Sequence, residues 1–401
     1  MHDSPTNEPR AKDPCAAILE RALFLSEDHT FTAVREWKLA HPGALAIGHM
    51  PIYTPRPLIE ATGCLAVGVF GAGAQIDIIR GDSYFQSYLC HIPRSTLELA
   101  LAGHLDSLDG MVFPSICDVI RNLSGMWQML FPERWAFYLD LPQNFDPGLG
   151  GRFYLEQMRA MARELEARGA RPLTSEALRD AIVDENARRA ALEALDALRR
   201  REPWRVRASE AYQVVRAGTL MSAREHAHML GEFTAAALQR PARLIDNARV
   251  VVVGSFCEQP PLALIQTLER SGCDIVEDDF MLGLRTIERP IELRGGDPLE
   301  DLARAFLEDG AETASRYIAD HRKGDALIGQ VRRSGADGVI FAAASFCDPA
   351  LLDQPMLETA LDREGIPHTS FKFSENTGQF QGIREQAGAF SDAVKLWEGQ
   401  V

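Results

Sequence analysis

The chain has 401 residues and a hydrophobic content of 46%, which is enough for two or three domains with buried cores and excludes predominant disorder. Acidic residues outnumber basic residues by 57 to 42, so the formal net charge is −15. A charge of this sign repels phosphate backbones and anionic lipids, and it disfavours nucleic acids and membrane surfaces as partners.

No run of 18 consecutive apolar residues occurs, so we expect no membrane-spanning helix. The first fifteen residues are polar and proline-rich, and they lack the apolar segment of a secretory signal. We therefore expect a cytoplasmic protein. In that compartment, seven scattered cysteines favour free thiols over a disulfide framework.

The first half of the chain alternates apolar runs with amphipathic stretches. A helical pattern over residues 14–41 precedes four predicted strands, and further helices are predicted at residues 88–105 and 119–130. The strands are continuous apolar runs, which is typical of a parallel sheet covered on both faces. These predicted strands are residues 44–52, 65–70, 110–113 and 135–141.

A charged region at residues 151–201 follows, and its mixed charge and helical spacing predict a pair of solvated helices. The alternation of strands and helices then resumes. We therefore predict an α/β fold with two parallel-sheet domains, residues 44–205 and 206–401, after a leader and helical segment at residues 1–43. The second half contains predicted helices at 209–239, 262–271 and 379–397 and predicted strands at 249–255 and 339–344.

One short pattern occurs three times, each time where a predicted strand ends. A small residue, a bulky apolar residue, a cysteine and an acid follow one another, and a helical pattern begins soon afterwards. The carboxyl ends of parallel strands face the crevice where ligands bind, and a helix N-terminus there lowers the pKa of a thiol. The three copies contain Cys117, Cys257 and Cys347.

A fourth thiol, Cys90, lies beside His91 in a predicted helix. Thiolates drawn from strand ends and a helix can bind an iron-sulfur cluster or a structural zinc ion. These cysteines are far apart in the sequence and no C-x-x-C pair occurs, so spacing alone leaves open whether they are ligands or ordinary buried cysteines. For Cys15, Cys64 and Cys273 we expect no ligand role.

Three other motifs favour structural roles. The glycines of residues 68–73 do not follow the dinucleotide-binding order and predict a loop with positive φ angles. His226 and His228 are two apart in a predicted helix, so they point to different faces and cannot share a metal ion. The acids at 277–279 follow a short apolar run, and we expect them to be solvated or to cap a helix rather than to bind a cation.

No P-loop motif occurs, so we expect any ATP to be hydrolysed by another chain. Near the C-terminus, Glu375, Gln379 and Arg384 surround a loop before the last predicted helix. Helix capping and contact with an anion or substrate are both open for these three residues.

Long segments from about Phe31 onwards resemble the 2-hydroxyacyl-CoA dehydratase and benzoyl-CoA reductase family, and within it the C (gamma) subunits of ATP-dependent benzoyl-CoA reductases. The segments occur in the family's order, which makes a chance match improbable. They include GDSYFQSYLCHIPRSTLELAL, DGMVFPSICDVIRNLSGMWQMLFP, GSFCEQPPLALIQTLERSGCDIVEDDF and IPHTSFKFSENTGQFQGIREQAGAFSDAV.

The resemblance implies Rossmann-like α/β domains with a helical part, and a 4Fe-4S cluster held by Cys90, Cys117 and Cys347. Cys257 is a candidate fourth ligand. The resemblance also implies a homologous B subunit that shares the active site, ATP-binding A and D subunits, and ferredoxin as the electron donor. His91, next to an implied ligand, is a candidate proton donor, and a purely hydrogen-bonded role is the alternative.

We therefore predict an iron-sulfur subunit that carries low-potential electrons for the dearomatisation of benzoyl-CoA to a cyclohexadiene-carboxyl-CoA. Two alternatives stay open. One is a subunit of a 2-hydroxyacyl-CoA dehydratase, which uses the same scaffold. The other is an electron-relay or structural partner whose sibling subunit binds the substrate.

Overall fold

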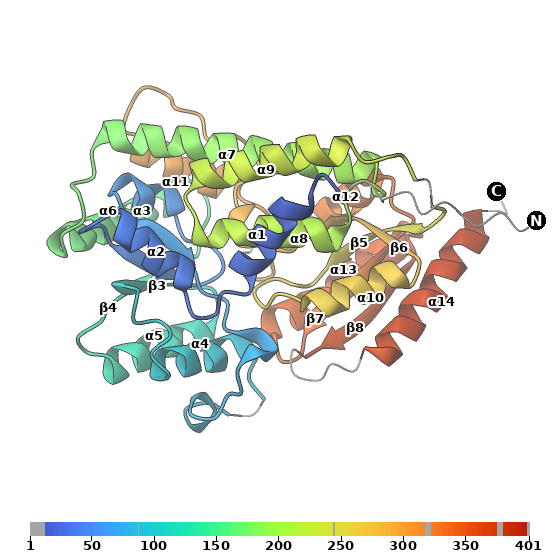
Figure 1. Ribbon diagram of the computed structural model, residues 1–401, viewed down its shortest axis with the longest axis horizontal. Helices are drawn as coiled ribbons and strands as arrows, with labels where there is room; N and C mark the ends of the chain where they lie inside the picture. Colours follow the sequence, from blue (N-terminus) through green and yellow to red (C-terminus); the bar gives the residue numbers. More distant parts are fainter. Residues whose placement is uncertain (1–12, 87, 244, 317–321, 375–379, 399–401) are drawn as a thin grey trace, which may run out of the picture.

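The computed structural model describes residues 13–86, 88–243, 245–316, 322–374 and 380–398. It contains two four-stranded sheets, all of whose strands are parallel, with helices packed around them (Figure 1). The predicted α/β class with two Rossmann-like parallel sheets is therefore confirmed. The predicted division into residues 44–205 and 206–401 stays a prediction.

The first sheet has the strand order β2-β1-β3-β4 and contains all four strands predicted for the first half. The strands β1, β2 and β3 are buried along their whole length, whereas the edge strand β4 alternates buried and half-buried residues. Burial on both faces explains the continuous apolar runs. The elements are β1 (Ala46–His49), α3 (Arg56–Ala61), β2 (Leu65–Gly68), α4 (His91–Leu101), β3 (Gly110–Pro114), α5 (Asp118–Leu130) and β4 (Trp135–Leu139).

The second sheet has the strand order β6-β5-β7-β8, with the two predicted strands β5 and β7 in the middle. The strand β8, with the sequence HTSFKF, was not predicted, because an edge strand with one exposed face carries polar residues. The elements are β5 (Ala248–Val253), α10 (Leu262–Arg270), β6 (Cys273–Asp278), α11 (Pro298–Asp309), α12 (Asp325–Ser334), β7 (Gly338–Ala344), α13 (Asp348–Arg363), β8 (His368–Phe373) and α14 (Gln381–Glu398).

The remaining helices form a layer against both sheets. Figure 1 shows the long helices α7 and α9 lying side by side along this layer. The single helical pattern predicted at residues 14–41 is two helices, separated at Phe31, whose φ of 56° is left-handed and cannot continue a helix. These helices are α1 (Ala16–Ser26), α2 (Thr32–Ala40), α6 (Gly150–Ala167), α7 (Ser175–Arg201), α8 (Ala208–Ala217) and α9 (Ala223–Leu238).

The helix α7 is not the solvated helix that its charge predicted. Arg188 and Arg199 are among the largest fully buried side chains of the chain. Arg188 pairs with Glu185 one turn earlier, and Arg199 pairs with Asp278 at the end of β6. The prediction was wrong because the apparent surface charges are partners of one another inside the protein.

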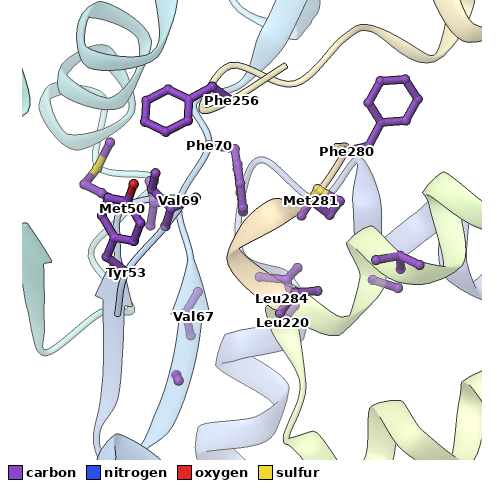
Figure 2. Close-up of a cluster of buried hydrophobic side chains, with 14 of the residues drawn as sticks. Met50, Tyr53, Val67, Val69, Phe70, Leu220, Phe256, Phe280, Met281 and Leu284 are labelled. Carbon is purple, nitrogen blue, oxygen red and sulfur yellow. The ribbon is translucent and has the colours of Figure 1, made fainter. Parts of the chain in front are cut away.

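One apolar core joins the two sheets. Figure 2 shows that Met50 and Phe70, which follow strands of the first sheet, belong to the same buried cluster as Phe256 and Met281, which follow strands of the second. The carboxyl ends of both sheets therefore lie against a shared core. Among the described residues, no helix combines the length and the apolar content that a membrane crossing needs.

The buried pair between Arg199 and Asp278 gives a first prediction. Arg199→Ala leaves the carboxylate of Asp278 buried without its closest cation, and we expect a loss of about 3 kcal/mol in the free energy of unfolding. The matched control is Arg332→Ala, which removes an exposed pair with Glu364 and is expected to change stability little. Thermal unfolding of the two variants tests this difference, and equal melting temperatures would contradict it.

Candidate functional site

Three of the four candidate cysteines occupy the N-cap positions of helices. Cys117 lies between β3 and α5, Cys347 lies between β7 and α13, and Cys90 precedes α4. The N-terminus of a helix carries partial positive charge from its unpaired amides, and this charge favours a thiolate. Each of these three thiols therefore lies at the end of a helix where its anionic form is stabilised.

Cys257 lies in the loop between β5 and α10 rather than at the start of a helix. The next residue, Glu258, is buried, and its carboxylate accepts a hydrogen bond of 2.9 Å from the backbone amide of His91. This bond joins the start of α4 to the loop that follows β5. It therefore fixes the segment that carries Cys90 against the segment that carries Cys257.

The four thiols lie close enough to influence one another electrostatically. Burial raises the pKa of Cys257 well above its ordinary value, and the charges of Cys347, Cys117 and Cys90 raise this pKa further. The pKa of Cys90 is raised by burial, then by Glu258, and then by Cys347 and Cys117. Folding therefore brings thiols from both sheets into one cluster.

Backbone amides at the helix starts act in the opposite direction. Burial is the largest effect on both Cys117 and Cys347, and it raises the pKa of Cys347 to about 12. The amides of Val119 and Ile120 lower the pKa of Cys117, and the amide of Ala350 lowers that of Cys347. The site thus offers hydrogen-bond donors to any thiolate that forms at Cys117 or Cys347. A bound cation would have to neutralise the negative charge of these thiolates.

The donor chemistry of this thiol cluster fits a polynuclear iron-sulfur group. A single zinc ion needs its thiolates about 2.3 Å from one point, whereas the iron atoms of a cluster each take a separate thiolate. Both groups take thiolate sulfur, so four thiols from separate strand ends and a helix fit an iron-sulfur cluster in their chemistry. In the part of the chain that the structure describes, no group of three or more His, Cys, Asp or Glu side chains is arranged to hold a metal ion.

The acids that follow the cysteines have different environments. Asp118 and Asp348 are exposed, whereas Glu258 is buried among the thiols, where its charge raises the pKa of Cys90, Cys257 and Cys347. The repeated pattern of cysteine and acid placed an acid at all three positions without distinguishing them. Sequence reasoning did not identify Glu258, because burial distinguishes it from the two exposed acids and becomes visible only after folding.

The chain matches the pattern of a known protein family. The pattern of the 2-hydroxyglutaryl-CoA dehydratase D-component family matches residues 51–394. The chain belongs to this family. The family resemblance predicted from the sequence is therefore confirmed.

Several members of the family are similar to this chain over most of their length. The C subunit of benzoyl-CoA reductase from Thauera aromatica is 47% identical over 383 residues, which cover 95% of this chain and 99% of that protein. The (R)-phenyllactyl-CoA dehydratase beta subunit of Clostridium sporogenes is 26% identical, with 88% and 92% covered. The beta subunit of (R)-2-hydroxyglutaryl-CoA dehydratase from Acidaminococcus fermentans is 28% identical, with 88% and 93% covered. All three relatives are subunits of enzymes that act on CoA thioesters.

Other residues of this family member lie away from the thiol cluster. Cys15, Cys64 and Cys273 are buried, and burial is the largest cause that raises the pKa of each. The expectation that none of the three is a ligand stays a prediction. His226 is buried and its Nε2 bonds to the carbonyl of Val214, whereas His228 is exposed, so the two histidines do face different ways.

Two further expectations concern loops. Gly71 and Gly73 have φ angles of 76° and 56°, as predicted for a loop, whereas Gly68 is the last residue of β2 and has no positive φ. Arg384 is an exposed residue of α14. Glu375 and Gln379 lie outside the described residues.

Of the acids at 277–279, Asp278 is buried and the other two are half-buried, so the prediction of fully solvated acids was wrong. Asp278 is buried against Arg199, and the carboxylate of Asp279 accepts hydrogen bonds from the amides of Gly254 at 2.7 Å and Ser255 at 3.1 Å. The end of β6 runs beside β5 rather than into solvent. Asp279 therefore holds the first residues of the loop that leads to Cys257.

The pKa of Asp279 gives a second prediction. Burial raises this pKa from its ordinary value of 3.8 to about 7. The folded chain therefore binds the proton more tightly than the unfolded chain, so the stability that this proton contributes is present below pH 4 and is lost as the pH rises through 7. The side chain of Asn does not titrate in this range. We therefore expect the melting temperature of Asp279→Asn, measured relative to that of the wild type, to increase as the pH rises from 6 to 8.

The matched control is Asp337→Asn. The carboxylate of Asp337 is half-buried like that of Asp279, and it also accepts a backbone hydrogen bond, of 2.7 Å from the amide of Arg249. This variant therefore shows the effect of replacing a half-buried carboxylate that is bonded to a backbone amide. A constant difference for Asp279→Asn over the same pH range would contradict the account of Asp279.

Proposed function

We propose that this chain is the iron-sulfur subunit of an ATP-dependent benzoyl-CoA reductase. The observation that carries the proposal is the position of Cys117, Cys257 and Cys347 directly after the interior strands β3, β5 and β7, with Cys90 at the start of α4. The identity of 47% with the C subunit of a benzoyl-CoA reductase supports this assignment over other members of the family. The reaction proposed is reduction of benzoyl-CoA to a cyclohexadiene-carboxyl-CoA.

Cys90, Cys117 and Cys347 would hold a 4Fe-4S cluster, with Cys257 as the candidate fourth ligand. When bound, such a cluster supplies electrons at the low potential that reduction of an aromatic thioester needs. Helix amides stabilise negative charge at Cys117 and Cys347. Burial of the thiols limits contact with water and, together with these hydrogen bonds, sets the potential at which an electron is held.

The residues around the cysteines have positioning and proton-transfer roles in this proposal. Glu258 holds the amide of His91 and so fixes the first turn of α4. The side chain of His91 is buried directly after Cys90, which makes it our candidate donor of a proton to the reduced substrate. A radical anion formed from an aromatic ring requires a nearby proton, so a histidine at this place suits the chemistry.

We further propose that the chain works in a hetero-oligomer in the cytoplasm. The partners are a homologous B subunit that shares the active site, A and D subunits that bind ATP, and ferredoxin. Exposed apolar side chains support a partner surface beside Cys347: Phe346, Leu352 and Met356 are 50%, 74% and 50% exposed. Apolar side chains grouped on a surface mark sites of protein association.

The alternative function is that of a 2-hydroxyacyl-CoA dehydratase subunit. The family match and the dehydratase beta subunits that are 26% and 28% identical favour this alternative. Both functions need the same thiols, but they differ in the fate of the electron. A reductase consumes electrons and ATP with every turnover, whereas a dehydratase recovers its electron and needs only a catalytic supply.

The ligand assignment gives a third prediction. Anaerobically purified wild-type chain is expected to contain about four iron atoms and as many sulfide ions, and Cys117→Ser is expected to lose most of both. The matched control is Cys64→Ser, which changes a buried thiol outside the cluster and is expected to retain its iron. Equal iron contents in the two variants would remove Cys117 from the ligand set.

The assignment of the reaction gives a fourth prediction. The complete complex, supplied with benzoyl-CoA, ATP and a reductant, is expected to form the cyclic diene with ATP and electrons consumed in proportion to product. The matched substrate is a 2-hydroxyacyl-CoA under the same conditions. Loss of water from that substrate with only trace electron input, and no reduction of benzoyl-CoA, would establish the dehydratase alternative.

A further inference from the structure

A second candidate site is a small cavity lined by residues of α3, α6, α7 and α11 and of the loops that follow β1 and β6. None of the four clustered cysteines lines it. The volume available to the centre of a water molecule is about 40 Å³. One water needs roughly 10–15 Å³ on this measure, so the cavity has room for a small polyatomic ion.

The lining is rich in cations and hydrogen-bond donors. Arg56, Arg188 and Arg189 line the cavity, and Glu185 is the acid among the lining residues. Arg188 is fully engaged, because it donates to both carboxylate oxygens of Glu185 and to the carbonyl of Leu284. Arg189 lies 3.6 Å from the same carboxylate and is therefore the less compensated cation.

Three buried donors on this lining have no hydrogen-bond partner in the described part of the chain. They are Oγ1 of Thr54, Nε of Arg56 and Nε of Arg189. Arg56 is only 3% exposed, and its terminal nitrogens donate to the carbonyls of Gly218 and Met221 and, at 3.5 Å, to the carboxylate of Glu60. Buried polar groups are rarely left unpaired in a folded protein, so three such donors around one cavity point to a bound acceptor.

The surrounding charges agree with an incompletely neutralised site. Burial is the largest effect on the pKa of Arg56 and of Arg189, and it lowers both. The carboxylates of Glu60 and Glu185 act against this lowering without reversing it. An anion in the cavity would complete the compensation of these two cations.

We propose that this cavity binds an oxyanion of the phosphate class, either free phosphate or a phosphate group of a larger ligand such as coenzyme A. Guanidinium groups match phosphate oxygens in geometry and charge. Donors from the β1 loop, α3 and α7 suit a tetrahedral acceptor. The cavity is too small for a whole coenzyme, so such a ligand would insert only a phosphate.

The test is calorimetric titration of the full-length chain with inorganic phosphate, against chloride at equal ionic strength. We expect saturable binding of one phosphate per chain that chloride does not reproduce. Arg189→Gln and Thr54→Val are expected to weaken it at least tenfold. The matched control is Arg332→Gln, which removes an exposed arginine outside the cavity and is expected to leave phosphate binding unchanged.

Two further measurements complete the test. Melting temperatures show that each variant is folded, and iron analysis of Arg189→Gln, expected to equal the wild type, keeps this proposal separate from the proposed function. Displacement of phosphate by coenzyme A would identify a ligand-borne phosphate, and lack of displacement would identify the free ion. Absence of saturable binding, or equal affinity in the wild type and both folded cavity variants, would overturn the proposal.

Discussion

The shared core between the two sheets determines where the cysteines lie. In a parallel sheet all strands end at the same edge, so the residues that follow them collect there. Cys117, Cys257 and Cys347 follow β3, β5 and β7, each of which lies in the interior of its sheet. Apolar residues next to these strand ends, such as Phe256, pack into the core that joins both sheets. The core thereby places three positions that are far apart in the sequence at strand ends that face it.

Opposing electrostatic effects then determine the protonation of the thiols. Burial disfavours a free thiolate, and neighbouring thiols and Glu258 disfavour it further, whereas helix amides favour it. The balance leaves the free thiols protonated at neutral pH, as the pKa of about 12 for Cys347 indicates. Iron bound to such thiols, as we propose, would release their protons, so the loading of the site would depend on pH.

The sequence predicted correctly the elements whose burial is visible in their local residue pattern. The central strands β5 and β7 are continuous apolar runs, and the cysteines after them could be placed at strand ends without a structure. The edge strand β8 could not be recognised from its sequence, because several of its residues are polar. The many charged residues of α7 predicted a solvent-exposed helix, although Arg199 and Asp278 neutralise each other inside the protein. The burial of Glu258 and the arginine-lined cavity depend on segments distant in sequence, which no local pattern reveals.

We propose that folding builds one iron-binding site from Cys90, Cys117 and Cys347, with Cys257 beside them. Anomalous X-ray diffraction at the iron absorption edge, from crystals of the anaerobically purified chain, locates any bound iron directly. We expect a single compact group of iron peaks in contact with these thiols. Iron bound elsewhere in the chain, or thiols clustered without any iron peak, would contradict this proposal.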